Sequence, residues 1–194
     1  MLVWLLLGSI VMANAGDTTL LRVPKIVAFD LDGTIWYPDM YMLWGGGAPF
    51  EVVDAKRTLT DCRGQQVNLL GVSGQILHDI NTKEEFKDTH VAWVSKTDEP
   101  SWADECLRKF ETPGGIHLIE TAQHSHIYKG SKAEHFRNLQ RETNVAFEDM
   151  LFFDNESGNI RTVGALGVPS IYCPDGMTQN IWEEGLRTFE MSKK

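Results

Sequence analysis

The stretch KIVAFDLDGT, residues 25–34, places two aspartates directly after a run of apolar and β-branched residues. Continuous apolar runs of this kind are typical of parallel strands that are covered on both faces, so we expect Ile26–Phe29 to form a buried strand. Asp30 and Asp32 then lie at its carboxyl end. Two carboxylates so close together at the end of a buried strand cost free energy, because they repel each other and lose hydration. A cation between them would offset this cost. The stretch therefore predicts a site that holds a positive charge.

Short apolar runs alternate with longer amphipathic segments along the rest of the chain, which is typical of βαβ units. This pattern predicts a three-layer α/β/α sandwich with a Rossmann-like central parallel sheet. A small β-hairpin insertion is expected around residues 62–64, and the histidines of QHSH, residues 123–126, are expected in a solvent-facing loop. The other expected strands are 90–94, 115–120, 150–154 and 169–172, and the expected helices are 74–86, 99–110, 130–143, 158–167 and 178–189.

Length and charge narrow the classes of function. With 194 residues, the chain suits one domain over residues 25–194. Its net charge of −9 argues against nucleic-acid binding, because such surfaces need a basic patch that releases counterions from phosphates. The three cysteines are odd in number and widely spaced, which predicts reduced thiols and neither a zinc site nor a disulfide framework.

Residues 1–24 form a separate apolar segment. Ala13-Asn14-Ala15 has the small-x-small form of a signal-peptide cleavage site after Ala15, which favours the secretory pathway. No Lys or Arg precedes the apolar run, which favours an N-terminal extension that packs on the domain, or a wrong start site. The run is shorter than the ~20 apolar residues of a transmembrane helix, so no stable membrane span is expected.

Four segments are expected to deliver polar side chains to one edge of the sheet. In open α/β sheets, right-handed crossovers bring the carboxyl ends of the strands together, and ligands bind there. The four segments are Asp30 with Asp32, residues 95–97, the segment around Lys132, and residues 154–156. Their convergence predicts a single site built from several strands.

These residue types suit phosphoryl transfer. Mg²⁺ prefers one or two carboxylates together with water and phosphate oxygens, and Asp154 could complete a site begun by Asp30 and Asp32. With a phosphate held there, Asp30 can attack phosphorus as a nucleophile, and Asp32 can protonate the leaving oxygen and then deprotonate water. Ser95 and Lys132 would bind the transferring phosphoryl oxygens.

The same segments resemble a known set of motifs. DLDGT, residues 30–34, has the DxDxT form of the haloacid dehalogenase-like superfamily of phosphohydrolases. The apolar strand that ends in Ser95 resembles its second motif, Lys132 matches its third, and Asp154 belongs to its fourth. The four motifs stand in the order of the superfamily, so the resemblance implies a phosphohydrolase.

The chain further resembles the magnesium-dependent phosphatase type one family from Lys25 onward, in stretches such as FDLDGTIW, IYKGSKAEHFRNLQRET and FEDMLFFDNESGNI. That family has no large cap domain. The resemblance implies a cytoplasmic phosphomonoesterase with Mg²⁺ as its cofactor, and phosphotyrosine or amine-linked sugar phosphates as its substrates. The implied phosphate-binding residues are Leu31, Asp32, Ser95, Lys96 and Lys132, and the implied metal ligands are Asp30, Asp32, Asp154 and Asn155.

Two positions depart from the family. Asn155 stands where members often carry a second acidic residue, and Lys96 stands where members can have Arg, which removes a two-pronged phosphate contact but keeps the charge. The aromatic segment 39–51 is individual to this chain and is expected to line the substrate entrance. A phosphoserine/threonine protein phosphatase of similar fold, and a non-catalytic phosphate-binding protein, are the alternative functions.

Overall fold

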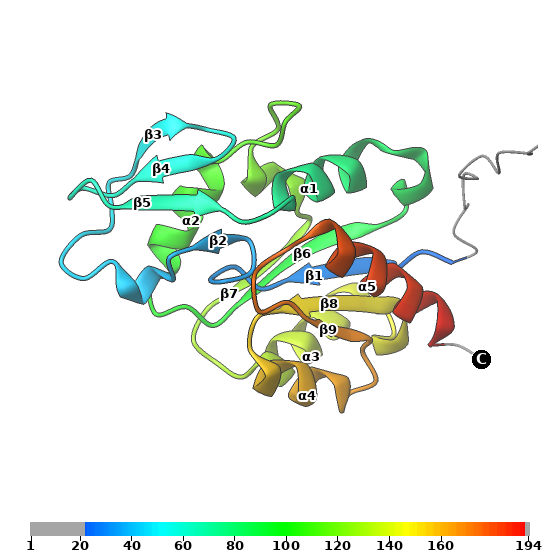
Figure 1. Ribbon diagram of the computed structural model, residues 1–194. Helices are drawn as coiled ribbons and strands as arrows, with labels where there is room; N and C mark the ends of the chain where they lie inside the picture. The colour runs from blue at the N-terminus through cyan, green and yellow to red at the C-terminus, as the bar shows by residue number, and fades with distance from the viewer. Residues whose placement is uncertain (1–21, 193–194) are drawn as a thin grey trace, which may run out of the picture.

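The computed structural model describes residues 22–192, and its centre is a five-stranded parallel sheet (Figure 1). The strand order is β7-β6-β1-β8-β9, and each neighbouring pair is parallel. The strands are β1 (Ile26–Phe29), β6 (His90–Ser95), β7 (His124–Ile127), β8 (Met150–Asp154) and β9 (Ser170–Tyr172). The predicted α/β fold with a central parallel sheet is confirmed.

Five helices cover the two faces of this sheet. They are α1 (Ser73–Thr82), α2 (Pro100–Lys109), α3 (Lys132–Thr143), α4 (Ser157–Gly164) and α5 (Gln179–Met191). Because side chains alternate along a strand, Val27 and Phe29 of β1 join one hydrophobic cluster with residues of α1, α2 and α5, whereas Ile26 and Ala28 join a second cluster with residues of α3 and α4. The sheet is therefore buried on both faces, as the apolar runs predicted.

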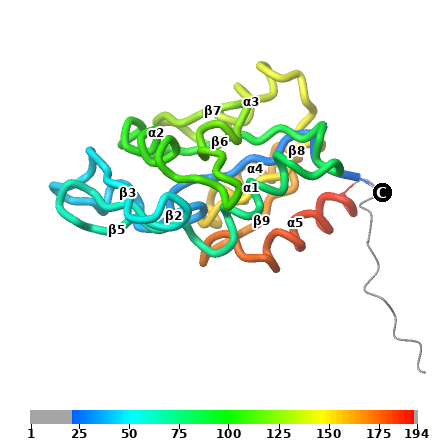
Figure 2. The backbone as a smooth tube through the Cα atoms, turned by 90° about the horizontal axis from the view of Figure 1, so that it is seen from above, coloured from blue at the N-terminus to red at the C-terminus, as the bar shows by residue number. Residues whose placement is uncertain are grey.

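A second, antiparallel sheet lies at one end of the molecule (Figure 2). Its order is β2-β5-β4-β3, with β2 (Trp36–Tyr37), β3 (Glu51–Asp54), β4 (Thr58–Thr60) and β5 (Gln66–Leu69). The predicted hairpin corresponds to β4 and β5, while β2 and β3 were not predicted, since β2 has only two residues and all four residues of β3 are exposed.

The small sheet shares its core with the large one. Trp36, Leu59 and Val67 are fully buried in the same hydrophobic cluster as Phe29 of β1. The ring of Trp36 stacks on Phe110, which follows α2, with 6.3 Å between centroids. The two sheets are thus packed as one body.

The predicted strand 115–120 is wrong. Leu118–Thr121 forms a short 3-10 helix, η3, and β7, one of the two edge strands of the sheet, contains the histidines expected in a loop. His126 is buried there, and its backbone pairs with Val94 of β6. The alternating polar residues of HSHI suit an edge strand, because one of its sides is not covered by a neighbouring strand.

Glu142 of α3 explains why these histidines turn inward. Its carboxylate lies 2.7 Å from Nδ1 of His124 and 3.1 Å from Nε2 of His126. Nε2 of His124 is in turn 3.0 Å from Nδ1 of His90. The expectation of solvent-facing histidines is therefore wrong, because a carboxylate distant in sequence completes the cluster.

The other elements differ from expectation mainly at their ends. The helix expected over 74–86 ends at Thr82 and continues as the 3-10 helix η2 (Glu84–Phe86). The Ser131 hydroxyl accepts a hydrogen bond from the backbone N–H of Glu134 at the start of α3. Two further 3-10 helices are η1 (Met40–Met42) and η4 (Phe147–Asp149).

Within residues 22–192, no helix is long and apolar enough to cross a membrane. The predicted signal peptide or extension falls almost wholly on residues 1–21, which lie outside the described residues. Cys62, Cys106 and Cys173 are free thiols, as predicted.

His135 of α3 makes the stability of the fold sensitive to acid. It is fully buried, and burial together with nearby Lys132 lowers its pKa from 6.5 to about 4. As the pH falls below 6.5, the unfolded chain therefore takes up a proton that the folded chain does not, at a cost to stability of up to ~1.4 kcal/mol per pH unit. We expect the melting temperature of the wild type to fall more steeply between pH 6.5 and pH 4 than that of His135→Phe. Parallel melting curves for the two proteins would contradict this.

Candidate active site

Asp30 and Lys132 form the centre of a buried ionic cluster at the carboxyl end of the large sheet. Asp30 directly follows β1, and Lys132 is the first residue of α3. The Lys132 ammonium donates to Oδ1 of Asp30 at 2.5 Å and also to the backbone carbonyl of Val94 in β6. The Lys132 side chain is fully buried. A lysine in this setting is held by its charge partners, because burial of an unpaired charge is costly.

Asp154, the last residue of β8, contacts the same lysine. Its Oδ2 is 3.2 Å from Nζ of Lys132. Asp154 also accepts hydrogen bonds from the backbone N–H of Glu156 at 2.7 Å and from the side-chain amide of Asn159 at 2.9 and 3.1 Å. These donors fix the carboxylate, so three elements of the fold place two carboxylates around one ammonium.

Asp32 lies two residues beyond Asp30 and is held by a different group. The indole N–H of Trp36 donates to its Oδ1 at 2.8 Å. Burial raises the pKa of Asp32 from 3.8 to about 6, although the hydrogen bond from Trp36 acts in the opposite direction. Asp32 is therefore poised to exchange a proton near neutral pH, as a general acid or base requires.

Ser95 ends the neighbouring strand, β6, and Lys96 follows it. Ser95 is buried, and its hydroxyl accepts from the backbone N–H of Thr97 at 3.3 Å. The Lys96 ammonium pairs with Glu156 at 2.7 Å and lies 3.3 Å from Oδ1 of Asn159. Both residues line the same cavity, of about 100 Å³, as Asp30 and Asp32. The structure thus brings the second predicted motif to the first.

Leu31 and Asn155 hold less direct positions. The Leu31 side chain is fully buried, and its carbonyl accepts from the backbone N–H groups of Thr34 and Ile35. The Asn155 side chain lies over Gly33, where a Cβ would come within 2.1 Å of its amide nitrogen. Asn155 lines a neighbouring cavity and does not line the one around Asp30. The structure therefore sets Asn155 apart from the ionic cluster.

Negative charge outweighs positive charge in the cluster. Burial raises the pKa of Asp30 from 3.8 to about 7, with Lys132 lowering it and Asp154 raising it. Burial likewise raises the pKa of Asp154. One lysine thus faces more carboxylates than it can neutralise, and an oxygen-binding divalent cation suits such a site.

The described residues offer carboxylates for this cation but no complete protein cage. Among residues 22–192, no group of three His, Cys, Asp or Glu side chains is arranged to hold a metal ion. Mg²⁺ prefers one or two carboxylates, the other ligands being water and phosphate oxygens, and Asp30 and Asp154 supply two carboxylates that lie around one ammonium. The residues present therefore fit Mg²⁺.

Two supporting residues were not predicted, namely Trp36, which donates to Asp32, and Asn159, which donates to Asp154. Thr97 lines the cavity beside Ser95, as expected for the segment 95–97. Asn159 lies five residues after Asp154, in the first turn of α4. The expected helix after Asp154 could therefore have indicated that Asn159 turns back toward this carboxylate. Trp36 gives no such signal, because its apolar ring fits the core equally well.

Comparison with known proteins agrees with this chemistry. The model of a family described as Acid Phosphatase matches residues 22–192. The chain is 34% identical over 170 residues to human Magnesium-dependent phosphatase 1, covering 87% of this chain and 88% of the relative. It is 29% identical over 154 residues to a HAD-like hydrolase superfamily protein of Schizosaccharomyces pombe, covering 76% of this chain and 84% of the relative.

Solved structures share the fold at low sequence identity. A magnesium complex of a HAD family enzyme from Bacteroides thetaiotaomicron matches with a TM-score of 0.56 and 10% identity, over 84% of this chain and 99% of that chain. A phosphatase-containing part of a Bacteroides fragilis protein, complexed with Mg, matches with a TM-score of 0.57 and 19% identity, over 87% of this chain but only 40% of that chain. With the family match over residues 22–192, the chain belongs to the acid phosphatase family and is a haloacid dehalogenase-like, magnesium-dependent phosphatase.

Proposed function

We propose that this phosphatase hydrolyses phosphomonoesters through a phosphoaspartate on Asp30. The observation that supports the proposal most strongly is the contact of Asp30 with Lys132, at 2.5 Å, in a cavity that Asp32 and Ser95 also line. A nucleophile, a proton donor and a fixed cation are the groups that phosphoryl transfer needs.

In the first step, a carboxylate oxygen of Asp30 attacks phosphorus, and the bond from phosphorus to the leaving oxygen breaks. Protonated Asp32 gives its proton to that oxygen, so the alcohol or phenol leaves neutral. Lys132 stays beside Asp30 and stabilises negative charge as it spreads over the phosphoryl oxygens. Ser95 binds one of these oxygens through its hydroxyl, and Lys96 contributes positive charge at the mouth of the cavity.

In the second step, the Asp32 carboxylate takes a proton from water as the water oxygen attacks phosphorus. The bond from phosphorus to the Asp30 oxygen breaks, which restores the carboxylate and releases inorganic phosphate. Asp32 ends protonated, ready for the next turnover. A pKa of about 6 suits both roles, because neither protonation state of Asp32 is rare near neutral pH.

Asp30 and Asp154 would hold the magnesium ion. Asp32 lies next to Asp30 and adds a further negative charge. When bound, Mg²⁺ neutralises the clustered carboxylates and the phosphate charge. Asn155 was a second candidate ligand at the fourth motif, and its position over Gly33 favours Asp154 for this role.

Removal of the metal gives a direct test. We expect treatment with a chelator to abolish hydrolysis of p-nitrophenyl phosphate, and added Mg²⁺ to restore it, because the carboxylates at Asp30 and Asp154 otherwise repel the substrate dianion. Steady-state rates measured across a magnesium titration check this. Full activity after exhaustive chelation would contradict the metal assignment. Absence of hydrolysis at every magnesium concentration would favour the non-catalytic phosphate-binding alternative.

The open cavity suits aryl, protein-tyrosine or sugar phosphates as substrates. No separate cap domain stands over it among the described residues, since residues between β1 and β6 form the small sheet and α1. Hydrolysis rates on phosphotyrosine peptides, phosphoserine peptides and sugar phosphates distinguish these classes.

Trp36 offers a test of the role of Asp32. Trp36→Phe keeps a ring against Phe110 but removes the N–H that holds Asp32. We expect the rate on an alkyl phosphate to fall about tenfold more than the rate on p-nitrophenyl phosphate, because a poor leaving group depends more on general acid catalysis, which contributes about 10²–10⁴-fold. Equal losses on both substrates would contradict a proton-donating role for Asp32.

A further inference from the structure

A second cavity lies directly beside the catalytic one. Its volume is about 510 Å³, against about 100 Å³ for the cavity around Asp30. Asp39 and Tyr41 line both cavities and so form the wall between them. A molecule whose phosphate lies at Asp30 can therefore extend past Tyr41 into the larger space.

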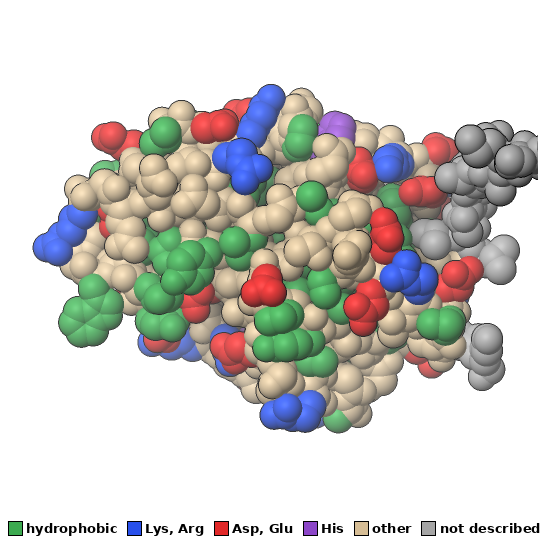
Figure 3. All heavy atoms as spheres, in the orientation of Figure 1, with side chains coloured by type: hydrophobic (Ala, Val, Ile, Leu, Met, Phe, Trp, Pro, Cys, Tyr) green, Lys and Arg blue, Asp and Glu red, His purple; other side chains and the backbone are tan. Residues whose placement is uncertain are grey.

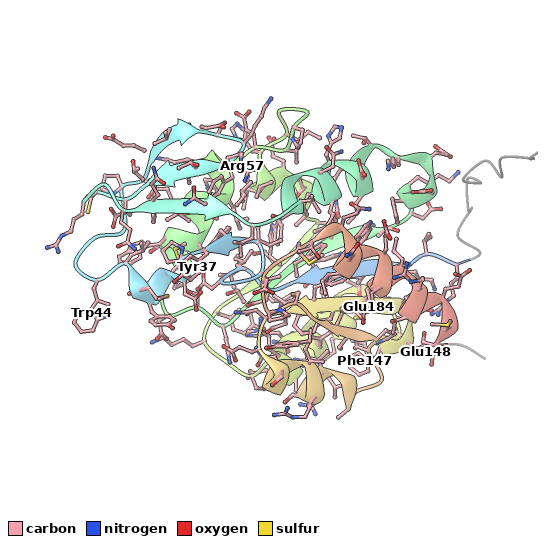
Figure 4. All side chains as sticks on the ribbon, in the orientation of Figure 1. Tyr37, Trp44, Arg57, Phe147, Glu148 and Glu184 are labelled. Carbon is pink, nitrogen blue, oxygen red and sulfur yellow. The ribbon has the colours of Figure 1, made fainter. Side chains whose placement is uncertain are left out.

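Exposed apolar side chains surround this second cavity. Tyr41 is 61% exposed and Met42 is 39% exposed, and both line it together with half-exposed Tyr37. Figure 3 shows hydrophobic side chains gathered on this side of the molecule. Trp44, which is 87% exposed, projects away from the ribbon nearby (Figure 4). Contiguous exposed apolar residues of this kind mark a surface that binds another molecule.

The charge of the second cavity is negative. Asp39 and Asp175 line it, and none of the Lys or Arg side chains within residues 22–192 does. Burial and the nearby Glu156, which lines the catalytic cavity, raise the pKa of Asp39. Lys96, which follows Ser95 at the catalytic cavity, is already paired with Glu156. A positively charged group would complement this rim.

We propose that the second cavity, with Tyr37, Tyr41 and Met42 as its apolar wall, binds the segment of a phosphopeptide next to its phosphotyrosine, and selects an apolar residue together with Lys or Arg. The proposal rests on the function proposed above and adds sequence selectivity to it. The apolar residue contacts Tyr41 and Met42, and the cation lies against Asp39 and Asp175.

The extent of the surface favours a peptide over a small phosphate ester. A sugar phosphate at Asp30 leaves Met42 and Trp44 uncovered, since these residues line only the second cavity or lie outside it. An extended peptide advances by about 3.3 Å per residue, so the residues beyond the phosphotyrosine can continue along this wall.

The test compares two phosphotyrosine peptides of equal length. In the basic peptide, each side of the phosphotyrosine carries one Leu and one Lys or Arg. In the acidic peptide, each side carries one Ser and one Glu. We expect kcat/KM to be at least about tenfold higher for the basic peptide at low ionic strength, and the difference to shrink in 0.5 M salt because screening weakens surface attraction. Equal kcat/KM values for the two peptides would overturn the proposal.

Two variants assign the effect to this surface. Asp175 lines only the second cavity, and Asp175→Asn is expected to reduce the preference about threefold. Met42→Ala is expected to raise KM for the basic peptide while leaving p-nitrophenyl phosphate hydrolysis unchanged. Met191→Ala is the matched control, because Met191 is also exposed but lies at the end of α5. A loss of preference in Met191→Ala equal to that in Met42→Ala would contradict the assignment.

The outcomes separate this proposal from the one it rests on. If p-nitrophenyl phosphate is not hydrolysed, the proposed function fails. If it is hydrolysed and the peptides are not distinguished, only the present inference fails. Sedimentation could instead show that the chain forms a dimer and that Met42→Ala dissociates this dimer. A second copy of the chain would then be the occupant of the surface, and the inference would be overturned.

Discussion

Asp30→Asn is expected to reduce hydrolysis of p-nitrophenyl phosphate by at least about 10⁴-fold, since loss of a nucleophile removes the acceptor of the phosphoryl group. The amide is nearly the same size as the carboxylate and still accepts a hydrogen bond from Lys132, so the fold is expected to remain. Initial rates measured at saturating Mg²⁺ check the loss. Turnover above 1% of the wild-type rate would exclude Asp30 as the nucleophile.

The same substitution is expected to change stability little, because two effects oppose each other. Burial raises the pKa of Asp30 to about 7, so a neutral amide removes the cost of burying its charge at pH 8. The amide also removes one of the two carboxylates that contact buried Lys132, while Asp154 still contacts it, so we expect the melting temperature of the metal-free variant at pH 8 to stay close to that of the wild type. Asp104→Asn is a suitable control, because Asp104 pairs with Arg108 on the exposed face of α2. A large drop in melting temperature for Asp30→Asn alone would indicate a structural role.

Lys132→Met is expected to lower kcat by about 10²–10³-fold, the range for removal of one fixed group that stabilises the transition state. Methionine keeps most of the buried stem but removes the ammonium that contacts Asp30 and Asp154. The unpaired carboxylates are expected to lower the free energy of unfolding of the metal-free protein by about 3 kcal/mol, as for other broken buried ion pairs. Urea denaturation measures this change.

Lys129 provides the matched control for Lys132. It lies three residues before Lys132, but its ammonium pairs with Asp98 at the surface and its side chain is 73% exposed. Lys129→Met should change kcat and stability little, since exposed ion pairs contribute about 0–1 kcal/mol. Added Mg²⁺ should raise the melting temperature of Lys132→Met more than that of the wild type. Similar losses in both lysine variants would contradict a special role for Lys132.

The large sheet could be predicted because its strands are short, apolar and separated by amphipathic helices. β1 and β8 are buried on both faces, so every residue of these runs is apolar up to the terminal aspartates. β7 could not be predicted in the same way. Its inward residues are histidines whose partner, Glu142, lies 18 residues from His124, and no local pattern encodes such a pairing.

The ionic cluster around Lys132 could be predicted from the sequence for a related reason. Asp30, Ser95 and Asp154 each end a strand of one sheet, and topology alone brings such positions together. The contacts that hold the cluster, from Trp36 and Asn159, depend on how side chains turn in three dimensions. The second cavity was anticipated only as an aromatic entrance. Gly46 and Gly47 of the segment 39–51 do not line this cavity and instead lie against Asp61 and Trp102.

The packing of the small sheet on the large one bears on the timing of catalysis. Trp36, Leu59 and Val67 are anchored in the main core, so the small sheet cannot swing open as a rigid lid without exposing that core to water. Opening of this kind would approach the cost of global unfolding. Turnover should therefore lack the microsecond-to-millisecond domain closure that limits many enzymes, and product should leave by diffusion from a permanently open mouth. New specificity in this scaffold would then arise from side-chain changes at that mouth, without any change in domain motion.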